Sequence, residues 1–253
     1  MLSIVIPVYN EKENIRPLLE EISAVARAVP ITEVLYVDDG SDDGTHLHLQ
    51  ELSVTYPFVR IIQHSKRSGQ SRGLWSGVSH ASGPLIVTLD GDGQNNPADI
   101  PLLLELYQME AAKNPRVMIA GQRLKRNDNL VRRLSSRAAN AIRSYFLKDG
   151  TRDTGCSLKL FRREDYMALP YFNHMHRYLP ALMKGHYVEV CHVDVSHRPR
   201  GRGVSKYGFF DRLWAGAHDL FGVRWLLKRA RPDINVTDLT PMREKRRDSI
   251  NSR

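Results

Sequence analysis

The sequence lacks the features that mark several common protein classes. Only two cysteines occur in 253 residues, Cys156 and Cys191, so we expect two reduced thiols and no disulfide framework. No segment approaches the roughly 18 apolar residues of a membrane span, because charged residues interrupt the longest candidate, WAGAHDLFGVRWLL at 214–227. The first residues, MLSIVIPVYNE, have no basic segment of the kind that begins a signal peptide. We therefore expect a protein that is not integral to a membrane.

The common phosphate-binding motifs are missing as well. No G-x-G-x-x-G follows the first predicted strand, and no G-x-x-x-x-G-K-[ST] occurs in the sequence. The usual dinucleotide site and a P-loop are therefore excluded. Any bound phosphate would have to be held by a metal ion and by Arg or Lys side chains. The histidines predict no zinc site, because neither pair with close spacing, His46/His48 or His174/His176, has a third ligand nearby in the sequence.

Positive charge is in excess and is unevenly distributed. The net charge is +9 at pH 7, with 42% hydrophobic and 26% charged residues, a composition typical of a globular protein. From residue 228 to residue 253 there are eight Lys or Arg, four acids and few apolar residues. We interpret residues 229–253 as a basic, flexible tail. Such a charge suits nucleic acid, an anionic lipid surface or no specific partner, and composition alone does not choose among them.

Strand and helix patterns alternate over the first half of the chain. Continuous apolar strands separated by helices indicate an α/β fold with a mostly parallel central sheet and helices on both faces. No repeat or composition break marks a second domain, so we expect one domain over 1–228 that ends in an amphipathic helix at about 205–228. The predicted strands are 2–9, 33–39, 59–64, 84–92, 117–123 and 187–197, and the predicted helices are 14–29, 41–56, 68–81, 98–113, 130–147 and 176–185.

Charged and polar residues follow the ends of these strands. Ligands bind beyond the carboxyl ends of the strands in open parallel sheets, so these residues are expected to share one edge. A nucleotide site at that edge is favoured over a set of solvated loops. The first strand ends in PVYNE (7–11), the second in Asp38-Asp39-Gly40-Ser41, the fourth in Asp90-Gly91-Asp92 and the fifth in Gln122-Arg123.

The segment VTLDGDGQNNP contains the candidate metal site. Asp90 and Asp92 lie one residue apart at the end of an apolar strand, where their charges repel, and a divalent cation would offset that repulsion. Carboxylate and amide oxygens are hard donors that suit Mg²⁺ or Mn²⁺ bridging a diphosphate. An Asp-x-Asp alone is a weak signal, because acids often cap turns, but a second acidic strand end at Asp38-Asp39 strengthens it.

Four motifs resemble those of family 2 glycosyltransferases: IVIPVYNEKENI, VDDGSDDGT, LDGDGQNNPADI and AGQR. The resemblance covers roughly residues 2–228. It implies a GT-A fold with a Rossmann-like nucleotide-binding half, and inversion at the anomeric carbon of a nucleotide-sugar. DGDGQNNP, MHRYLPAL (175–182) and HRPRGRGVSKYG (197–208) resemble the polyprenyl-phosphate branch, typified by dolichyl-phosphate mannose synthase. DTGCSLKLFRRE replaces the TSGF-type segment of those synthases, which leaves the sugar and the nucleotide, UDP or GDP, open.

The resemblance also implies roles for individual residues. The metal ligands would be Asp92 and Gln94, with Asp90 beside them. The nucleotide side would be lined by Pro7, Tyr9, Glu11, Asp38, Asp39 and Asp90. Arg123, Arg132, Ser136 and Arg200 would surround the phosphates, with Lys206 on the same loop as Arg200. Asp92, Arg123 and Arg200 are thus the catalytic candidates, and Arg123, Arg132, Ser136 and Lys206 are the candidates for the acceptor phosphate.

A missing general base indicates the class of acceptor. A sugar hydroxyl is a poor nucleophile and needs a base, yet the only Glu-Asp pair in the second half of the sequence, Glu164-Asp165, is expected to start a helix. A lipid monophosphate has a second pKa near about 6 and is already an anion at pH 7. We therefore favour a polyprenyl-phosphate acceptor at the cytoplasmic face of a membrane. The alternative is a hydroxyl acceptor on a saccharide or protein. Nucleic acid is not an expected partner, because the clustered acids would repel its backbone.

The segment 206–232 combines aromatic and basic residues, and two interpretations are open. Its helix lies in the interface of an anionic membrane, which we favour, or it packs on the domain as an ordinary helix. A membrane-protein partner or a second copy of the chain also remains possible at this stage. The apolar residues concerned are Phe209, Phe210, Leu213, Trp214, Leu220, Phe221, Trp225 and Leu226.

Overall fold

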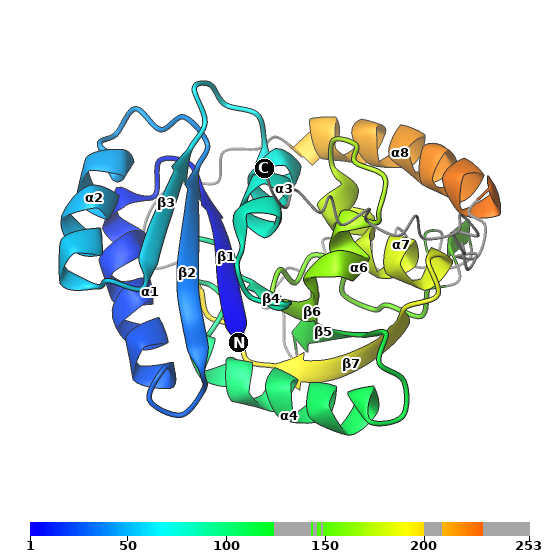
Figure 1. The fold of residues 1–253 in the computed structure, drawn as a ribbon. Coiled ribbons are helices and arrows are strands. Elements are labelled where there is room, and N and C mark those ends of the chain that lie inside the picture. The colour runs from blue at the N-terminus through cyan, green and yellow to red at the C-terminus, as the bar shows by residue number, and fades with distance from the viewer. Residues whose placement is uncertain (124–142, 144–145, 148, 200–208, 230–253) are drawn as a thin grey trace, which may run out of the picture.

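The computed structural model describes residues 1–123, 143, 146–147, 149–199 and 209–229, and in the last range it describes side chains from residue 218 onward. A seven-stranded sheet lies at the centre of this part of the chain, with helices on both faces (Figure 1). The strands are β1 (Leu2–Val8), β2 (Ile31–Asp38), β3 (Val59–Gln63), β4 (Leu85–Thr88), β5 (Val117–Arg123), β6 (Lys159–Arg162) and β7 (Glu189–Val195). The helices are α1 (Lys12–Val25), α2 (Thr45–Thr55), α3 (Gln70–His80), η1 (Pro97–Asp99), α4 (Ile100–Ala111), α6 (Arg163–Met167), η2 (Met175–Tyr178), α7 (Leu179–Gly185) and α8 (Phe209–Arg229).

The strands follow the order β3-β2-β1-β4-β6-β5-β7. β6 is antiparallel to both of its neighbours, β4 and β5, and the remaining pairs are parallel. All strands except β6 therefore end at the same edge of the sheet. The predicted α/β fold with a mostly parallel sheet is confirmed.

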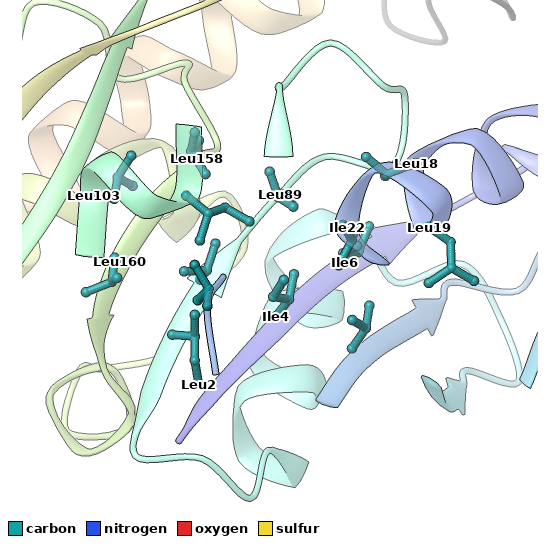
Figure 2. Close-up of a cluster of buried hydrophobic side chains, with 14 of the residues drawn as sticks. Leu2, Ile4, Ile6, Leu18, Leu19, Ile22, Leu89, Leu103, Leu158 and Leu160 are labelled. Atoms are coloured by element: carbon teal, nitrogen blue, oxygen red, sulfur yellow. The ribbon is translucent and has the colours of Figure 1, made fainter. Parts of the chain in front are cut away.

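Each face of the sheet carries its own hydrophobic core. On one face, Leu2, Ile4 and Ile6 of β1 pack under α1, α2 and α4, and Figure 2 shows them between the leucines of α1 and Leu103, Leu158 and Leu160. On the other face, Val5 packs with residues of α3, α6, α7 and α8. Successive strand residues point to opposite faces, and both faces are covered, so the strands are apolar at nearly every position.

The structure corrects two predictions from the sequence pattern. The helix predicted over 41–56 begins at Thr45, because Ser41 and Asp42 accept hydrogen bonds from Asn10 in the loop that follows β1. The segment after residue 155 contains β6, which was not predicted. β6 has four residues, two of them basic, so it lacks the apolar run that identified the other strands. Glu164 and Asp165 lie in α6, as predicted.

The C-terminal helix α8 packs on the domain and also exposes aromatic side chains. Leu220 and Val223 are buried against the core on the α3 side, whereas Phe221 and Trp225 are 63% and 56% exposed. No helix in the described part of the chain is long and apolar enough to cross a membrane. The side chains of Phe209, Phe210, Leu213 and Trp214 and the predicted tail lie outside the described residues, as does most of the predicted helix 130–147. The domain limits therefore stay a prediction.

Candidate active site

The carboxyl edge of the sheet brings together the predicted site residues that the structure describes. Pairing aligns Val8 with Asp38, and the Asp39 backbone N–H donates to the Val8 carbonyl at 2.9 Å. β4 lies on the other side of β1, so the loop that begins at Asp90 follows at the same edge. The residues gathered there are Pro7, Tyr9 and Glu11 after β1, Asp38 and Asp39 after β2, Asp90, Asp92 and Gln94 after β4, and Arg123 at the end of β5.

Hydrogen bonds join the loops that follow β1 and β2. The Asn10 backbone N–H donates to Ser41 Oγ at 2.9 Å, and Asn10 Nδ2 donates to Asp42 Oδ1 at 2.6 Å. Asn10 itself adopts a positive φ of 53°, which asparagine tolerates better than most residues. These contacts hold Tyr9 and Glu11 beside the acidic end of β2.

The two aspartates at the end of β2 differ in their partners. Asp38 Oδ1 accepts hydrogen bonds from the Ser41 backbone N–H and hydroxyl, while Oδ2 is buried and has no hydrogen-bond partner in the described structure. Asp39 accepts three hydrogen bonds, from the Ser68 and Gly69 backbone N–H groups and from His64 Nδ1, at 2.7 to 2.8 Å. Asp39 therefore connects β2 to the loop that precedes α3.

The loop after β4 is built for a close approach to β1. An ideal Cβ at Gly91 would lie 2.5 Å from Val8 Cγ1, so no other residue fits there without displacement. Asn95 fixes the loop from within, because its Oδ1 accepts from the Asp90 backbone N–H at 3.2 Å and from Ser157 Oγ at 2.6 Å. The Gln94 backbone N–H donates to Asp92 Oδ1 at 3.1 Å. Asp90, Asp92 and Gln94 are thus held in one short turn.

The electrostatics of Asp90 fit a divalent cation at this turn. Burial, and next the negative charge of Asp92, raise the pKa of Asp90 to about 6. A cation beside both carboxylates would favour their ionised forms and offset their repulsion. Gln94 Nε2 donates to the Arg198 carbonyl at 3.4 Å, which leaves the amide oxygen as the donor that a metal would require. The donor set of two carboxylates and one amide oxygen suits Mg²⁺ or Mn²⁺.

Arg123 lies at this edge in an ion pair that the sequence did not reveal. Its Nε and Nη2 donate to the two oxygens of Asp153 at 2.5 and 2.7 Å. Burial opposes the charge of Arg123, but the hydrogen bonds that it donates to Asp153, together with the negative charge of Asp153, more than offset burial and raise the pKa of the guanidinium. The buried ammonium of Lys159 in β6 interacts electrostatically with Cys156, Asp90 and Asp153, and burial nevertheless lowers its pKa.

The segment after β7 lies against the metal loop. His197 forms a β-bridge with Asn95, and Arg198 makes a bidentate ion pair with Glu21 of α1 at 2.7 and 2.8 Å. A hollow of about 280 Å³ lies beside this contact and is lined by Asp92, Gly93, Arg198, Pro199 and residues of α1. Arg200 and Lys206, and likewise Arg132 and Ser136, lie outside the described residues.

Comparisons with known proteins identify the family of the chain. Residues 3–169 match the model of glycosyl transferase family 2. The chain belongs to glycosyl transferase family 2. The chain is 32% identical over 237 residues to a dodecaprenyl-phosphate galacturonate synthase of Rhizobium johnstonii, covering 91% of this chain and 69% of that protein. It is 32% identical over 210 residues to an undecaprenyl-phosphate 4-deoxy-4-formamido-L-arabinose transferase of Pectobacterium carotovorum, covering 82% of this chain and 63% of the relative.

The solved structures support the fold of this family 2 chain. Glucosyl-3-phosphoglycerate synthase from Mycobacterium tuberculosis, crystallised with Mn²⁺, UDP and glucosyl-3-phosphoglycerate, superposes with a TM-score of 0.66 at 17% identity, over 91% of this chain and 80% of that one. The same synthase with Mn²⁺, UDP-glucose and glycerol 3-phosphate gives a TM-score of 0.64 at 18% identity. The predicted GT-A fold is confirmed.

Several site residues of this family 2 chain were missed from the sequence. Asp153, Lys159 and Ser157 reach the site because β6 runs antiparallel between β4 and β5, an arrangement that no sequence pattern indicated. Gln70 reaches it from the first residue of α3, where its Nε2 donates to Asp90 Oδ1 at 2.7 Å. The segment DTGC departs from the TSGF-type segment, and its aspartate, Asp153, is the sequence signal that could have identified the partner of Arg123.

Proposed function

We propose that this chain is an inverting glycosyltransferase that moves a sugar from a nucleotide-sugar to the phosphate of a polyprenyl-phosphate lipid. One lipid phosphate oxygen attacks the anomeric carbon while the bond from that carbon to the nucleoside diphosphate breaks. The products are a sugar-phosphate lipid and a free nucleoside diphosphate. The names of the relatives, a dodecaprenyl-phosphate galacturonate synthase and an undecaprenyl-phosphate aminosugar transferase, support this acceptor class.

The observation that carries the proposal is the position of Glu164 and Asp165. Because β6 is antiparallel, its end at Arg162 pairs with Leu85 at the start of β4, so α6 begins at the edge opposite to the site. Asp165 is also committed to an ion pair with Arg116 at 2.9 Å. This acidic pair therefore does not serve a hydroxyl acceptor as general base. A lipid phosphate, ionised at pH 7, needs positioning by cations and no deprotonation.

We assign the donor side of the site to the carboxyl ends of β1, β2 and β4. Asp92 and Gln94 would hold Mg²⁺ or Mn²⁺ with Asp90 beside them, and the bound ion would neutralise charge on the donor diphosphate and its leaving group. Pro7, Tyr9, Glu11, Asp38 and Asp39 would hold the nucleoside. Oδ2 of Asp38 is buried and has no hydrogen-bond partner among the described residues, which supports a donor from the ligand, such as a ribose hydroxyl or a base N–H.

We assign the acceptor phosphate to the basic residues. Arg123 lies among the described residues, at the end of β5, where its ion pair with Asp153 holds the guanidinium in place. Arg132, Lys206 and the hydroxyl of Ser136 would complete this set. Arg200, which also lies outside the described residues, stays a catalytic candidate from the sequence. Arginine suits this role, since its planar fork matches phosphate oxygens.

We further propose that the protein binds peripherally to the cytoplasmic face of a membrane through α8. Phe221 and Trp225, separated by one helical turn, are exposed, whereas Leu220 and Val223 anchor the helix to the core. Arg224 lies over Phe146 at 4.9 Å and Arg229 over Trp225 at 4.5 Å, so basic groups accompany the exposed aromatics. This combination is typical of an interfacial helix on anionic lipid. A membrane-protein partner or a homo-oligomer stays a prediction.

Transfer of label into lipid tests the proposal. The full chain is incubated with Mn²⁺, polyprenyl-phosphate in detergent, and a panel of radiolabelled UDP- and GDP-sugars, and the products are partitioned into butanol. We expect one labelled donor to yield a butanol-soluble product that requires both the enzyme and the lipid. Label that moves to a water-soluble saccharide instead, with none in the lipid, would favour the hydroxyl-acceptor alternative.

A further inference from the structure

Residues 68–71, where the chain enters α3, contact three separate parts of the site. The backbone N–H groups of Ser68 and Gly69 donate to Asp39 at the end of β2. Gln70 Nε2 donates to Asp90 Oδ1 at the end of β4, and Ser71 Oγ is 2.7 Å from His176 Nδ1 in η2. Four consecutive residues thus connect the nucleotide side of the site, its metal side and the segment MHRYLPAL.

The backbone at this point is specified by glycine. Gly69 has φ +90° and ψ 161°, a conformation that L side chains rarely adopt. This residue allows the chain to pass from the Asp39 contacts directly into the helix. As a result, Gln70 is the first helical residue, and its side chain reaches Asp90, which lies twenty positions later in the sequence.

Gln70 contacts the carboxylate of Asp90 and can therefore control its orientation. Asn95 binds the backbone N–H of Asp90 and so fixes the loop, whereas Ser157 and Gln70 both form hydrogen bonds with the carboxylate itself. A carboxylate on a short side chain can rotate, and a hydrogen bond to one oxygen fixes its plane. Gln70 donates to Oδ1 of Asp90, so the second carboxylate oxygen, Oδ2, can bind another ligand.

We infer that Gln70 is a positioning residue that holds the carboxylate of Asp90 in the orientation required at the metal site. The inference rests on the metal site of the proposed function. Hydrogen-bond partners that orient metal ligands typically contribute 10- to 100-fold in metal affinity. Asp90 and Gln70 are both partly buried, so water replaces the lost donor poorly.

A role confined to helix stability does not explain this contact. Within the described part of the chain, the N-cap residue of α3 makes no side-chain hydrogen bond to the helix, and Gln70 donates to Asp90. The same turn is held independently by Asp39 and by Ser71, whose hydroxyl is hydrogen-bonded to His176 Nδ1 at 2.7 Å and accepts from the His176 backbone N–H at 3.3 Å. Removal of the Gln70 amide should therefore leave the helix in place.

Direct measurement of Mn²⁺ binding tests the inference without any sugar or acceptor. Free Mn²⁺ is quantified by electron paramagnetic resonance in titrations of the full chain with saturating UDP and, separately, GDP. The variants are Gln70→Ala and Gln70→Met, the second of which keeps the length of the side chain but has no donor. Ser71→Ala is the matched control, because it loosens the same turn through His176 without removing the contact to Asp90.

We expect the Kd for Mn²⁺ to rise about 10- to 100-fold in both Gln70 variants, with melting temperatures in the absence of metal close to that of the wild type. Ser71→Ala should bind Mn²⁺ like the wild type. An unchanged Kd in the Gln70 variants would overturn the inference while leaving the metal site intact. Equal losses in Gln70→Met and Ser71→Ala would also overturn it, since the cause would then be a loosened turn. A wild-type chain that binds no Mn²⁺ with either nucleotide would refute the metal site itself.

Discussion

Arg123 and Asp153 form a bidentate ion pair at the rim of the site, with Nε–Oδ2 and Nη2–Oδ1 distances of 2.5 and 2.7 Å. Both side chains are largely buried, at 14% and 12% exposure. The Arg123 backbone N–H also donates to Asp153, at 3.3 Å. The aspartate therefore fixes both the end of β5 and the direction of the guanidinium that we assign to the acceptor phosphate.

The pair predicts a non-additive effect on activity. A hydrogen bond to a charged group contributes about 1.5–3 kcal/mol, so Arg123→Ala should lower kcat/KM by roughly ten- to a hundredfold. Asp153→Asn should cause a similar loss, because Arg123 is no longer held by a full negative charge. The double variant should be no worse than the poorer single variant. Independent, multiplicative losses in this double-mutant cycle would show that Asp153 does not act through Arg123.

The metal assignment predicts a severe effect at Asp92. Asp92→Ala and Asp92→Asn should each lower turnover by about a thousandfold or more, since metal stabilisation of the transition state is worth several kcal/mol. EDTA should abolish the activity of the wild-type enzyme, and added Mn²⁺ should restore that activity. Asp194→Asn, at an exposed aspartate of β7, is the control and should retain activity. Activity in Asp92→Ala without added metal would refute the assignment.

Glu33 predicts how stability depends on pH. It is buried at the opposite edge of the sheet, where Oε1 accepts hydrogen bonds from Ser3 Oγ and from the Ser82 backbone N–H, both at 2.6 Å. Burial alone would raise the pKa of Glu33, but these bonds, together with those from Arg60 and the Ser82 hydroxyl, lower it from 4.5 to about 2. The stabilisation is therefore complete above pH 4.5 and is lost as the pH falls toward 2.

The shift corresponds to roughly 3 kcal/mol of unfolding free energy. Urea unfolding at a series of pH values should show Glu33→Gln less stable than the wild type at pH 6, with the difference shrinking between about pH 4.5 and pH 2.5. Arg60 is half exposed, so loss of its contribution in Arg60→Ala should be smaller. A difference between Glu33→Gln and the wild type that stays constant over this range would contradict the shifted pKa.

Membrane binding through α8 has two separable parts. The full-length protein should bind vesicles that contain anionic lipid and should dissociate as salt rises, because each basic residue near the surface contributes about 1 kcal/mol and is screened over about 8 Å. Truncation after Arg231 should weaken binding and spare activity on a short, water-soluble acceptor. Trp225→Ala should weaken binding in a way that salt does not reproduce.

Met109 provides the control for this experiment. It is 57% exposed on α4, nearly the same as Trp225 at 56%, but it lies on the other face of the sheet. Met109→Ala should therefore leave vesicle binding unchanged. If the wild-type protein does not bind anionic vesicles at low salt, the proposed membrane association is wrong. If the truncated protein loses activity on the soluble acceptor, the tail belongs to the active site.

The sequence predicted the positions of those site residues that directly follow an apolar strand. Apolar strands that end in acids place Asp38, Asp39, Asp90 and Asp92 at one edge, because parallel strands share their carboxyl edge. The structure confirms this placement. The roles of these residues remain predictions.

The sequence did not predict contacts that depend on long-range topology. Asp153 meets Arg123 only because β6 inserts antiparallel between β4 and β5, and a four-residue strand with two basic residues has no distinctive pattern. Gln70 meets Asp90 only because α3 begins at the edge where β4 ends. The sequence presents packing on the domain and contact with a membrane as alternatives for the C-terminal helix. The helix packs on the core through Leu220 and Val223 and also exposes Trp225, so the two are compatible.

The acceptor is the central claim, and one comparison tests it most directly. The labelled donor identified in the butanol assay is supplied with either a polyprenyl phosphate or the polyprenol of the same chain length. The two lipids differ only in the phosphate that the arginines are proposed to hold and that requires no general base. We predict that label enters the lipid fraction with the phosphate and stays at background with the alcohol. Equal transfer to the polyprenol would contradict the account.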